Sequence, residues 1–568
     1  MAGDQGASAS NSAACSHGTH GHSHHHHHHL HSSPSAHSRQ QQPQKREQQE
    51  DQQSQQPTLD SVWKACAYGD LEAVQSFCEE DNSLVNRQDG GGYSALQWAA
   101  LNNRPAVASY LIDKGAALNA QDAQGQTALH WAAVKGSVAA AAVMLRAGAH
   151  PTLRDGRGYT ICHVASQYGQ TTLLYQLVLR WGIDLDAPDN DGRAALHWAA
   201  YKGYSDTVRL LLVLGASWGV ADKEGCTPLH WAAIRGNGEV CTLLLQGGSP
   251  SLLKQPDVTG STPAQLAVEK NHRYLGLTLA EWQQREEGGR LFGRKGRLYW
   301  LVSLQLCPAI WALIIGLVSL FLHKVVNFSG LPRLGPVAMF WAWAVVVSAS
   351  VGLVLLYLTT TADPGVIAPG SSHSRSSGPK LIDSPALWAG QWQQLCVTCK
   401  IVRPLRAKHC STSDRCVELF DHFCPWVGNT IGRGNRHYFL LFLWIELFAM
   451  TDSAIVAIVR IHQAVSSSSW ESSGGIQWPV IFLVVDLFVL ISVAALAITQ
   501  ATQISRNVTT NELANWQRYT YLRDPHGMFM NPFDKGCRNN CVEAMLPKHG
   551  STAPLVLPEQ EALLRAAV

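Results

Sequence analysis

Four apolar stretches in the second half of the chain give the clearest hydropathy pattern. They cover about residues 298–322, 336–358, 438–459 and 479–503. Each stretch is long enough to cross the ~30 Å hydrocarbon core of a bilayer as a helix. Only 15% of the 568 residues are charged, and the first two stretches contain no charged residue. The pattern therefore predicts four transmembrane helices.

Acidic residues interrupt the last two stretches at Glu446, Asp452 and Asp486. A carboxylate is costly to place against lipid. We therefore expect these three side chains to face protein or a polar cavity.

Basic residues on either side of the spans predict their orientation. Arg290, Arg294, Lys295 and Arg297 precede the first span. The loop 359–437 adds Lys400, Arg403, Arg406, Lys408, Arg415, Arg433 and Arg436. Cytosolic loops carry an excess of such residues. We therefore expect three parts of the chain in the cytosol: all residues before the first span, the loop 359–437 and, after four crossings, the C-terminal segment 506–568.

A repeating phrase fills the first half of the chain. It occurs as SALQWAA (94–100), TALHWAA (127–133), TICHVAS (160–166), AALHWAA (194–200) and TPLHWAA (227–233), with STPAQLA (261–267) as a weaker copy. The period of 33 or 34 residues and the phrase itself resemble ankyrin repeats. The resemblance implies about seven helix pairs within residues 58–288. Stacked repeats form an elongated concave surface that is typical of protein binding.

Histidines recur in this phrase at positions 130, 163, 197 and 230. They are either a set of metal ligands or a structural feature of each repeat. The second reading is favoured, because the resemblance places each ring where it hydrogen-bonds a turn of the neighbouring repeat.

Residues 1–57 have a low-complexity composition rich in Ser, Gln, Gly and His. Such a segment has too little apolar surface to offset the entropy of ordering, so we expect a disordered tail. The net charge of +2 gives no indication of nucleic-acid binding.

The cysteines are scattered singly through the first half and concentrated in 396–424, which indicates reduced thiols and a local metal site. The segment 396–439 reads CVTCKIVRPLRAKHCSTSDRCVELFDHFCPWVGNTIGRGNRHYF. It resembles the cysteine-rich domain of the DHHC protein S-acyltransferases, or palmitoyltransferases. DPG (363–365), TTNE (509–512) and NPFDKGCRNN (531–540) match further short motifs of that family in letters and position.

The resemblance implies a thioester relay. In the family, the motif cysteine, here Cys424, attacks a long-chain acyl-coenzyme A and then passes the acyl group to a cysteine of a protein substrate. A thiol with a pKa near ~8.5 is mostly protonated in the cytosol, so it needs a base or an imidazolium beside it. His422 is the candidate, oriented by Asp421. The alternative, a structural Cys424 with His422 as zinc ligand or core histidine, is less consistent with the intact Asp-His-x-Cys-Pro-Trp frame.

Family members bind two zinc ions, each through three Cys and one His. By this resemblance the first ligand set falls on Cys396, Cys399, His409 and Cys416, and the second on Cys410, Ser413, Phe423 and Thr430. The first set satisfies a closed tetrahedral zinc site, whereas three of four ligands are missing from the second. We therefore expect one structural zinc, with Phe423 filling apolar volume and Cys410 as a packed thiol.

The predicted fold class is mainly α. It comprises an ankyrin-repeat α-solenoid, a four-helix transmembrane domain and a small zinc-binding module of short β-hairpins at residues 386–436. The co-substrate is expected to be palmitoyl-coenzyme A, with the acyl chain in a cavity among the spans that opens toward Cys424. Arg433 and Arg436 are candidates for holding the coenzyme A phosphates, although solvated or lipid-facing charge is an equal alternative.

The resemblance also implies protein substrates recruited by the repeats and a location in the Golgi or another endomembrane. A different reading is an inactive ankyrin-bearing membrane scaffold that only recruits partners. An ankyrin-bearing channel is a further alternative, but no pore-forming segment lies between the spans.

Overall fold

The computed structural model describes residues 61–288, 306–327, 333–367, 384–466 and 476–546. The predicted tail 1–57, the start of the first predicted span and the last residues of the chain lie outside the described residues. The chain divides into two compact units, Met1–Gln283 and Gln284–Val568, and each is described by itself.

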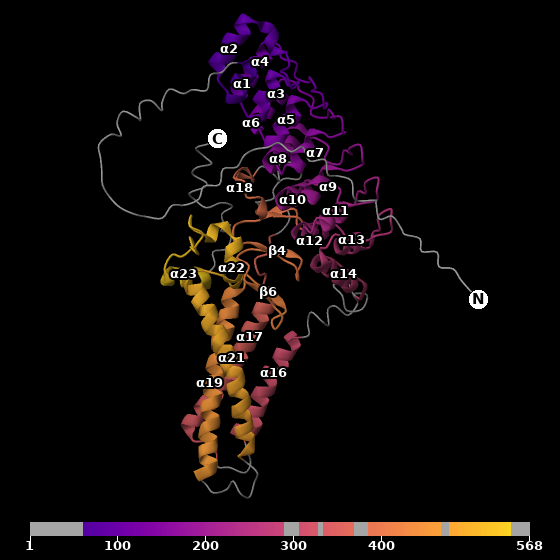
Figure 1. Cartoon of the computed structure of the whole chain (residues 1–568). Coiled ribbons are helices and arrows are strands. Elements are labelled where there is room, and N and C mark those ends of the chain that lie inside the picture. The colour runs from indigo at the N-terminus through magenta and orange to yellow at the C-terminus, as the bar shows by residue number, and fades with distance from the viewer. Residues whose placement is uncertain (1–60, 289–305, 328–332, 368–383, 467–475, 547–568) are drawn as a thin grey trace, which may run out of the picture. The chain divides into compact units, whose positions relative to one another are not determined.

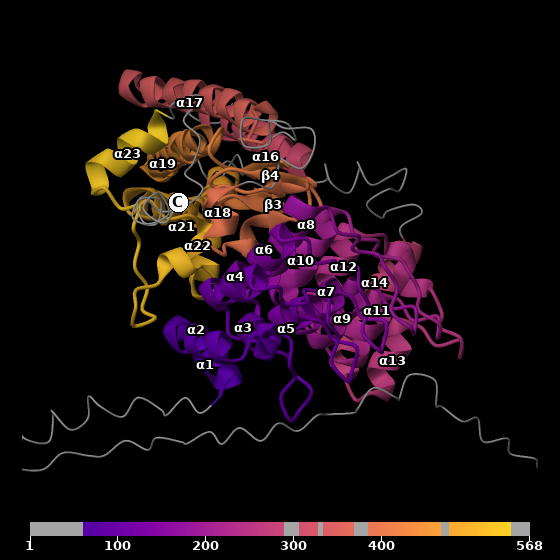
Figure 2. The ribbon, with the colours of Figure 1, turned by 90° about the horizontal axis from the view of Figure 1, so that it is seen from above.

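The first unit is a solenoid of seven helix pairs among the described residues, as predicted. The pairs are α1 (Val62–Tyr68) with α2 (Leu71–Glu80), α3 (Ala95–Leu101) with α4 (Pro105–Asp113), α5 (Ala128–Lys135) with α6 (Val138–Arg146), α7 (Ile161–Gln167) with α8 (Thr171–Trp181), α9 (Ala195–Lys202) with α10 (Ser205–Leu214), α11 (Pro228–Ile234) with α12 (Gly238–Gly247), and α13 (Pro263–Glu269) with α14 (Arg273–Gly288). Short 3-10 helices follow α2 (η1, Asn82–Val85) and α12 (η2, Pro250–Lys254). The pairs stack in sequence order (Figure 1), with first and second helices in separate rows (Figure 2).

The repeated histidine joins neighbouring repeats, as expected. In α5 the Nδ1 atom of His130 accepts the backbone N–H of Thr127, the N-cap residue, at 3.2 Å. The other ring nitrogen, Nε2, therefore carries the proton and donates to the carbonyl oxygen of Tyr159 in the next repeat at 2.9 Å. His163 and His197 make the same pair of contacts. Burial lowers the pKa of His197 to about 4, which keeps this ring neutral.

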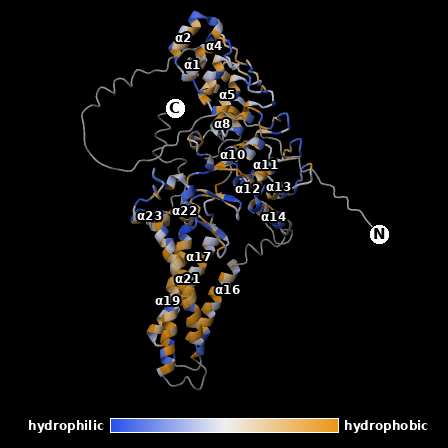
Figure 3. Cartoon of the chain, viewed as in Figure 1, coloured by the Kyte–Doolittle hydropathy of each residue, from blue (hydrophilic) through white to orange (hydrophobic). Residues whose placement is uncertain are grey.

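Within the described residues, four helices of the second unit are long and apolar enough to cross a membrane. They are α16 (Leu306–Leu320), which continues as the π-helix η3 (Phe321–Val326), α17 (Pro336–Thr361), α19 (Arg436–Ser466) and α21 (Gln477–Ser505). Apolar residues dominate all four helices (Figure 3). The protein is therefore an integral membrane protein, as predicted.

The helices extend beyond the predicted spans. The structure ends α19 at Ser466, past the predicted limit of 459, because backbone hydrogen bonding continues through polar residues such as Arg460 and Gln463. Hydropathy marks only the apolar part of a helix. The expectation for the three acidic residues is met: Glu446, Asp452 and Asp486 are buried, with exposed fractions of 5%, 5% and 2%.

A module of short hairpins lies between α17 and α19, as predicted. A short helix, α18 (Pro385–Trp388), and a 3-10 turn, η5 (Trp392–Gln394), lead into it. Its three antiparallel pairs are β1 (Leu395–Cys396) with β2 (Ile401–Val402), β3 (Lys408–Cys410) with β4 (Arg415–Val417), and β5 (His422–Cys424) with β6 (Asn429–Ile431). Strands this short cannot hold a module together alone, so cross-links between the hairpins must supply its stability.

The segment after α21 returns to this module. It contains α22 (Thr510–Asn515), the 3-10 turns η6 (Trp516–Arg518) and η7 (Thr520–Leu522), and α23 (Cys537–Met545). Asn540 in α23 donates its side-chain N–H to the carbonyl oxygen of Ser505 at 2.8 Å. This contact holds α23 beside the end of α21 (Figure 1).

Candidate active site and metal centre

Cys424 is the last residue of β5, and the turn that follows is held tightly. The N–H of Gly428, whose φ is +70°, donates to the carbonyl oxygen of Cys424 at 2.9 Å. Asn429, paired with Cys424 in the hairpin, donates its side-chain amide to the carbonyl oxygens of Thr359, Thr360 and Ala362 at 3.0–3.1 Å. The last carbonyls of a helix have no partner within it. Asn429 therefore fixes the hairpin to the end of α17.

The surroundings of Cys424 are apolar on the side of the spans. The residue is 6% exposed and belongs to a buried cluster with Ile314 of α16, Leu356 of α17, and Phe439 and Leu443 of α19. The thiol therefore lies where the hairpin module meets the membrane helices.

His422 and Asp421 form a close pair beside this cysteine. Nδ1 of His422 lies 2.6 Å from Oδ2 of Asp421, whose side chain is fully buried. Burial by itself lowers the pKa of His422, but the hydrogen bond to Asp421 and the adjacent Cys424 sulfur outweigh it and raise the pKa to about 9. The imidazole is therefore protonated at neutral pH.

The carboxylate of Asp421 is in turn held by the C-terminal segment. Its oxygens accept the backbone N–H of Thr510 at 2.6 Å and the hydroxyl of Thr510 at 2.9 Å. Burial alone would raise the pKa of Asp421, but the hydrogen bond from His422 and the charge of Arg436 lower it below its usual value. Asp421 thus stays ionised and can stabilise the imidazolium.

The TTNE segment reaches the module through a buried ion pair. Arg406 donates from Nε and Nη2 to the two carboxylate oxygens of Glu512, each at 2.7 Å. Glu512 also accepts the N–H of Thr509, which caps α22. This bidentate geometry places Thr510 against Asp421.

Asn429, Thr510 and Glu512 lie in motifs that resemble those of the family, but no role was predicted for these three residues from the sequence. Asn429 lies in the run that follows Cys424, and Thr510 and Glu512 lie in the TTNE motif just after span four, so their position in short motifs was the signal in the sequence. The contacts themselves join residues 67 to 106 positions apart.

The two arginines predicted as candidates for binding the coenzyme A phosphates differ in burial and in their hydrogen-bond partners. Arg436 is 3% exposed and donates to the carbonyl oxygen of Val508 at 2.9 Å. Arg433 is half-buried and pairs with Glu418 at 3.2 Å. Because the guanidinium of Arg436 is buried and its positive charge lowers the pKa of Asp421, Arg436 is poorly placed to bind a phosphate.

The first predicted zinc set is brought together. Ligand atoms of Cys396, Cys399, His409 and Cys416 all lie within 4.8 Å of one another. His409 pairs directly with Cys416 across β3 and β4, while Cys396 ends β1 and Cys399 lies in the turn between β1 and β2. Three thiols and one imidazole are the donor set of closed structural zinc sites. These residues therefore fit a structural zinc ion.

The four positions of the second set also come together, but only Cys410 among them is a good zinc donor. Phe423 pairs with Thr430 across β5 and β6, and the hydroxyl of Thr430 lies 3.4 Å from the Cys410 sulfur and 3.3 Å from Oγ of Ser413. Phe423 packs against the buried cluster of Cys410, Val417 and Phe420. Hydroxyl–thiol contacts and an aromatic ring therefore occupy the place of a second metal.

A thiol beside a half-buried imidazolium, in a hairpin module against four membrane helices, defines a membrane-bound enzyme that works through cysteine chemistry. The family model described as "DHHC palmitoyltransferase" matches residues 391–517, and ankyrin-repeat models match 62–155 and 196–245.

Curated relatives agree with these matches. The chain is 40% identical over 513 residues to "Probable protein S-acyltransferase 23" of Arabidopsis thaliana, covering 88% of this chain and 94% of the relative. It is 31% identical over 191 residues to "Palmitoyltransferase ZDHHC17" of Danio rerio, covering 32% of this chain and 30% of the relative. The chain belongs to the DHHC protein S-acyltransferase family and is a palmitoyltransferase, which confirms the resemblance.

We predict one tightly held zinc per chain in protein from which the His-rich tail has been removed. Cys399→Ser should release this zinc and disorder the hairpins, because the binding free energy of a structural zinc is also folding free energy. Elemental analysis of the purified protein measures the zinc content.

Cys410→Ser is the matched control, since it removes a buried thiol from the second set instead of the first. Its zinc content should stay at one per chain. A value of two zinc ions in the unmodified chain would show that the assignment of ligands to the two sets is wrong.

Proposed function

We propose that this enzyme moves a palmitoyl group from palmitoyl-coenzyme A to cysteines of protein substrates through an acyl-Cys424 intermediate. The observation that carries the proposal is the position of Cys424 between the Asp421–His422 pair and the apolar cluster of the membrane helices. At this position the sulfur of Cys424 can react as a thiolate beside the His422 imidazolium, and an acyl chain attached to the same sulfur can extend into the apolar cluster.

The reaction has two thioester exchanges. In the first, the Cys424 thiolate attacks the thioester carbon of the donor; a new C–S bond forms, the bond to coenzyme A breaks, and its thiolate takes up a proton. In the second, a substrate thiol gives its proton to His422, which becomes neutral when it protonates coenzyme A, and attacks acyl-Cys424; a new C–S bond forms and the bond to Cys424 breaks, which releases the Cys424 thiolate. Both steps conserve the thioester, so no further reactant is needed.

His422 serves these steps mainly as an imidazolium. With a pKa near 9 it is charged at neutral pH and stabilises the neighbouring thiolate of Cys424. Its proton is also available to the departing thiolate of coenzyme A. Asp421 is a positioning residue that keeps the ring oriented and charged.

The alternative of an inactive scaffold accounts less well for the buried Asp421. Asp421 is an ionised carboxylate without solvent contact that accepts hydrogen bonds from both His422 and Thr510. Binding of partner proteins by a scaffold would not require such a group. Burying an ionised carboxylate costs stability unless it is paired and hydrogen-bonded, and a scaffold would gain nothing from building those partners around Asp421.

The remaining assignments follow from this function. The structural zinc fixes the hairpins, the solenoid recruits protein substrates, and the module faces the cytosol, where acyl-coenzyme A is available. Basic residues around the loop 359–437 support that orientation. The Golgi or another endomembrane is the proposed location, and Arg433 remains a better candidate than the buried Arg436 for a coenzyme A phosphate.

Replacing Cys424 by Ala should abolish both self-acylation and transfer, because the motif contains no other nucleophile. Hydroxylamine-sensitive labelling of the purified protein with a palmitate analogue measures the intermediate. Cys410→Ala is the control, because it removes a buried thiol of the neighbouring hairpin. This variant should still be labelled on Cys424. Undiminished labelling of the Cys424 variant would contradict the proposed intermediate.

The rate of self-acylation should fall as the pH rises through about 9, where His422 loses its proton. Asp421→Asn removes the negative charge that helps to raise this pKa, so the alkaline limb should move to lower pH. Single-turnover rates across the alkaline range give the profile, with donor hydrolysis subtracted. A rate that continues to rise above this pH would show that neutral His422 acts as a general base instead.

Removal of residues 58–285 should leave self-acylation largely intact and reduce transfer to particular protein substrates. The solenoid forms its own compact unit, and stacked repeats depend mainly on their neighbours. Comparing label on the enzyme with label on a substrate separates the two steps. Loss of self-acylation in a well-folded shortened chain would contradict this division of roles.

A further inference from the structure

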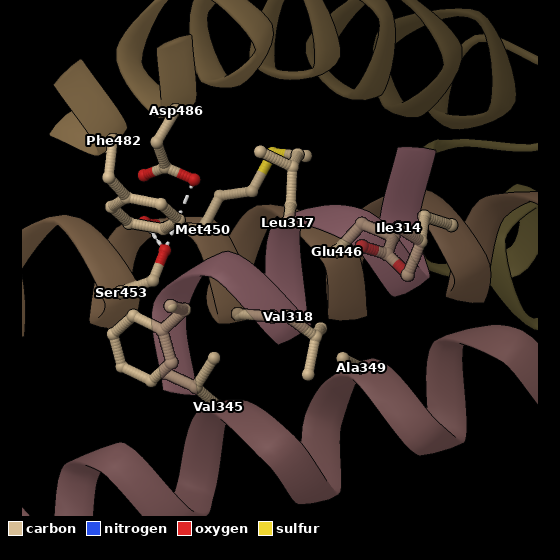
Figure 4. Close-up of a pocket in the computed structure, with 12 residues that line it drawn as sticks. Ile314, Leu317, Val318, Val345, Ala349, Glu446, Met450, Ser453, Phe482 and Asp486 are labelled. Carbon is tan, nitrogen blue, oxygen red and sulfur yellow. Dashed lines mark hydrogen bonds between the residues drawn. The ribbon is translucent and has the colours of Figure 1, made fainter. Parts of the chain in front are cut away.

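The helix α21 connects the membrane interior with the active site. Its residues Phe482 and Asp486 line a cavity of about 40 Å³ among the membrane helices (Figure 4). Further along the helix, Ala497 is buried in the apolar cluster that contains Cys424. Gln500 lies three residues beyond Ala497, so the two side chains lie on the same face of the helix. The apolar face of α21 therefore ends in a polar side chain at the level of the active site.

The amide of Gln500 is buried beside three acceptor oxygens. Its Nε2 atom lies 3.2 Å from Oγ1 of Thr510, 3.3 Å from Oε1 of Gln503 and 3.4 Å from Oδ2 of Asp421. The side chain belongs to a residue that is 3% exposed. An amide nitrogen carries two protons, and the two shorter contacts use both of them. Gln500 therefore acts mainly on Thr510 and Gln503, and only weakly on the carboxylate itself.

The hydroxyl of Thr510 has two acceptors within reach. Its oxygen lies 2.9 Å from Oδ2 of Asp421 and also 2.9 Å from Oε1 of Gln503. A hydroxyl has a single proton, so it donates to one of these oxygens at a time. Gln503 is 5% exposed, and a buried oxygen without a donor costs stability. The two acceptors therefore compete for the Thr510 proton unless Gln503 has another donor.

Gln500 is that other donor. One of its N–H groups reaches Oε1 of Gln503, and the second reaches the oxygen of Thr510 without using the hydroxyl proton. Because Gln503 is then satisfied, the hydroxyl of Thr510 can donate to Asp421.

We propose that Gln500 is a positioning residue of the acyl transfer, which keeps the hydroxyl of Thr510 turned toward Asp421. Without the amide of Gln500, Thr510 is the remaining donor within hydrogen-bond distance of Oε1 of Gln503 among the described residues. The hydroxyl then turns to Gln503, and the carboxylate of Asp421 loses one hydrogen bond.

The direction of this hydroxyl affects how strongly Asp421 holds the proton of His422. The inference rests on the proposed function, in which the imidazolium of His422 stabilises the Cys424 thiolate. A hydrogen bond from a neutral hydroxyl stabilises the carboxylate and weakens its attraction for the imidazolium proton. When the hydroxyl turns away, the pKa of His422 should therefore rise further above its ordinary value. This is the opposite of the change expected for Asp421→Asn.

Other charged or titratable groups also act on the pair of Asp421 and His422. They are Cys424 of β5, Arg436 of α19, and the ion pair of Arg406 and Glu512, whose charges act on Arg436. The variants below replace only neutral side chains, so the charges of these groups are the same in all of them.

The test measures single-turnover self-acylation of the full-length enzyme by palmitoyl-coenzyme A across the alkaline range, with donor hydrolysis subtracted. Gln500→Met removes the amide and keeps an unbranched side chain of similar length. The midpoint of the alkaline limb should move upward by about half a pH unit. Thr510→Val deletes the hydroxyl itself, so it should give a shift in the same direction.

A double variant isolates the competition for the hydroxyl proton. In Gln500→Met/Gln503→Met the competing acceptor is gone, so the hydroxyl of Thr510 should return to Asp421. The midpoint should then equal that of the unmodified enzyme. Gln477→Met is the matched control, because it makes the same substitution at an exposed position near the other end of α21 and should leave the midpoint unchanged.

An upward shift in Gln500→Met that is reversed in the double variant supports the proposal. An unchanged midpoint overturns it, as does a shift that persists in the double variant. A downward shift also overturns it, because that is the result of merely loosening Asp421 beside His422. If Gln500→Met does not fold, Thr510→Val decides: an upward shift supports the proposal, and any other result overturns it.

The unmodified enzyme separates this proposal from the proposed function. If it forms no adduct on Cys424, or shows no alkaline limb, the proposed role of Cys424 or of charged His422 fails, and the role of Gln500 fails with it. A normal adduct and a normal limb, with unshifted variants, overturn the role of Gln500 alone.

Discussion

The buried carboxylate of Asp421 is the group on which the catalytic centre depends. It holds the ring of His422, accepts two hydrogen bonds from Thr510 and lies within reach of Gln500 on α21. A charged group without solvent contact is tolerated only when it is paired and hydrogen-bonded. These partners therefore have to be assembled together, which links the folding of the module to that of the C-terminal segment.

Much of the fold could be predicted from sequence because its patterns are local. The 33- or 34-residue period identified the solenoid, and apolar length identified the four spans. The zinc set Cys396, Cys399, His409 and Cys416 was predicted from the resemblance to the family, whose ligand pattern fits residues that lie within about twenty positions of one another. Because its residues lie close together in the sequence, such a site can be predicted without a structure.

The partners of the site were not predictable in the same way. Asn429 binds the last carbonyls of α17, and Arg406 binds Glu512 more than one hundred residues away. No local periodicity contains such contacts, because they depend on how the chain returns to the module. The same applies to Arg436, whose position in sequence suggested an exposed charge although its side chain is buried against Val508.

The metal site and the reactive thiol are joined by packing rather than by chemistry. The first ligand set fixes β3 and β4 through the paired His409 and Cys416. The next residue, Cys410, contacts Thr430 of β6, and Thr430 pairs with Phe423, the neighbour of Cys424. A zinc ion bound by the first set would therefore be linked to the hairpin of Cys424 through contacts that need no second metal. Because a small shift of a reacting atom is costly in rate, such an ion would influence catalysis without taking part in the reaction itself.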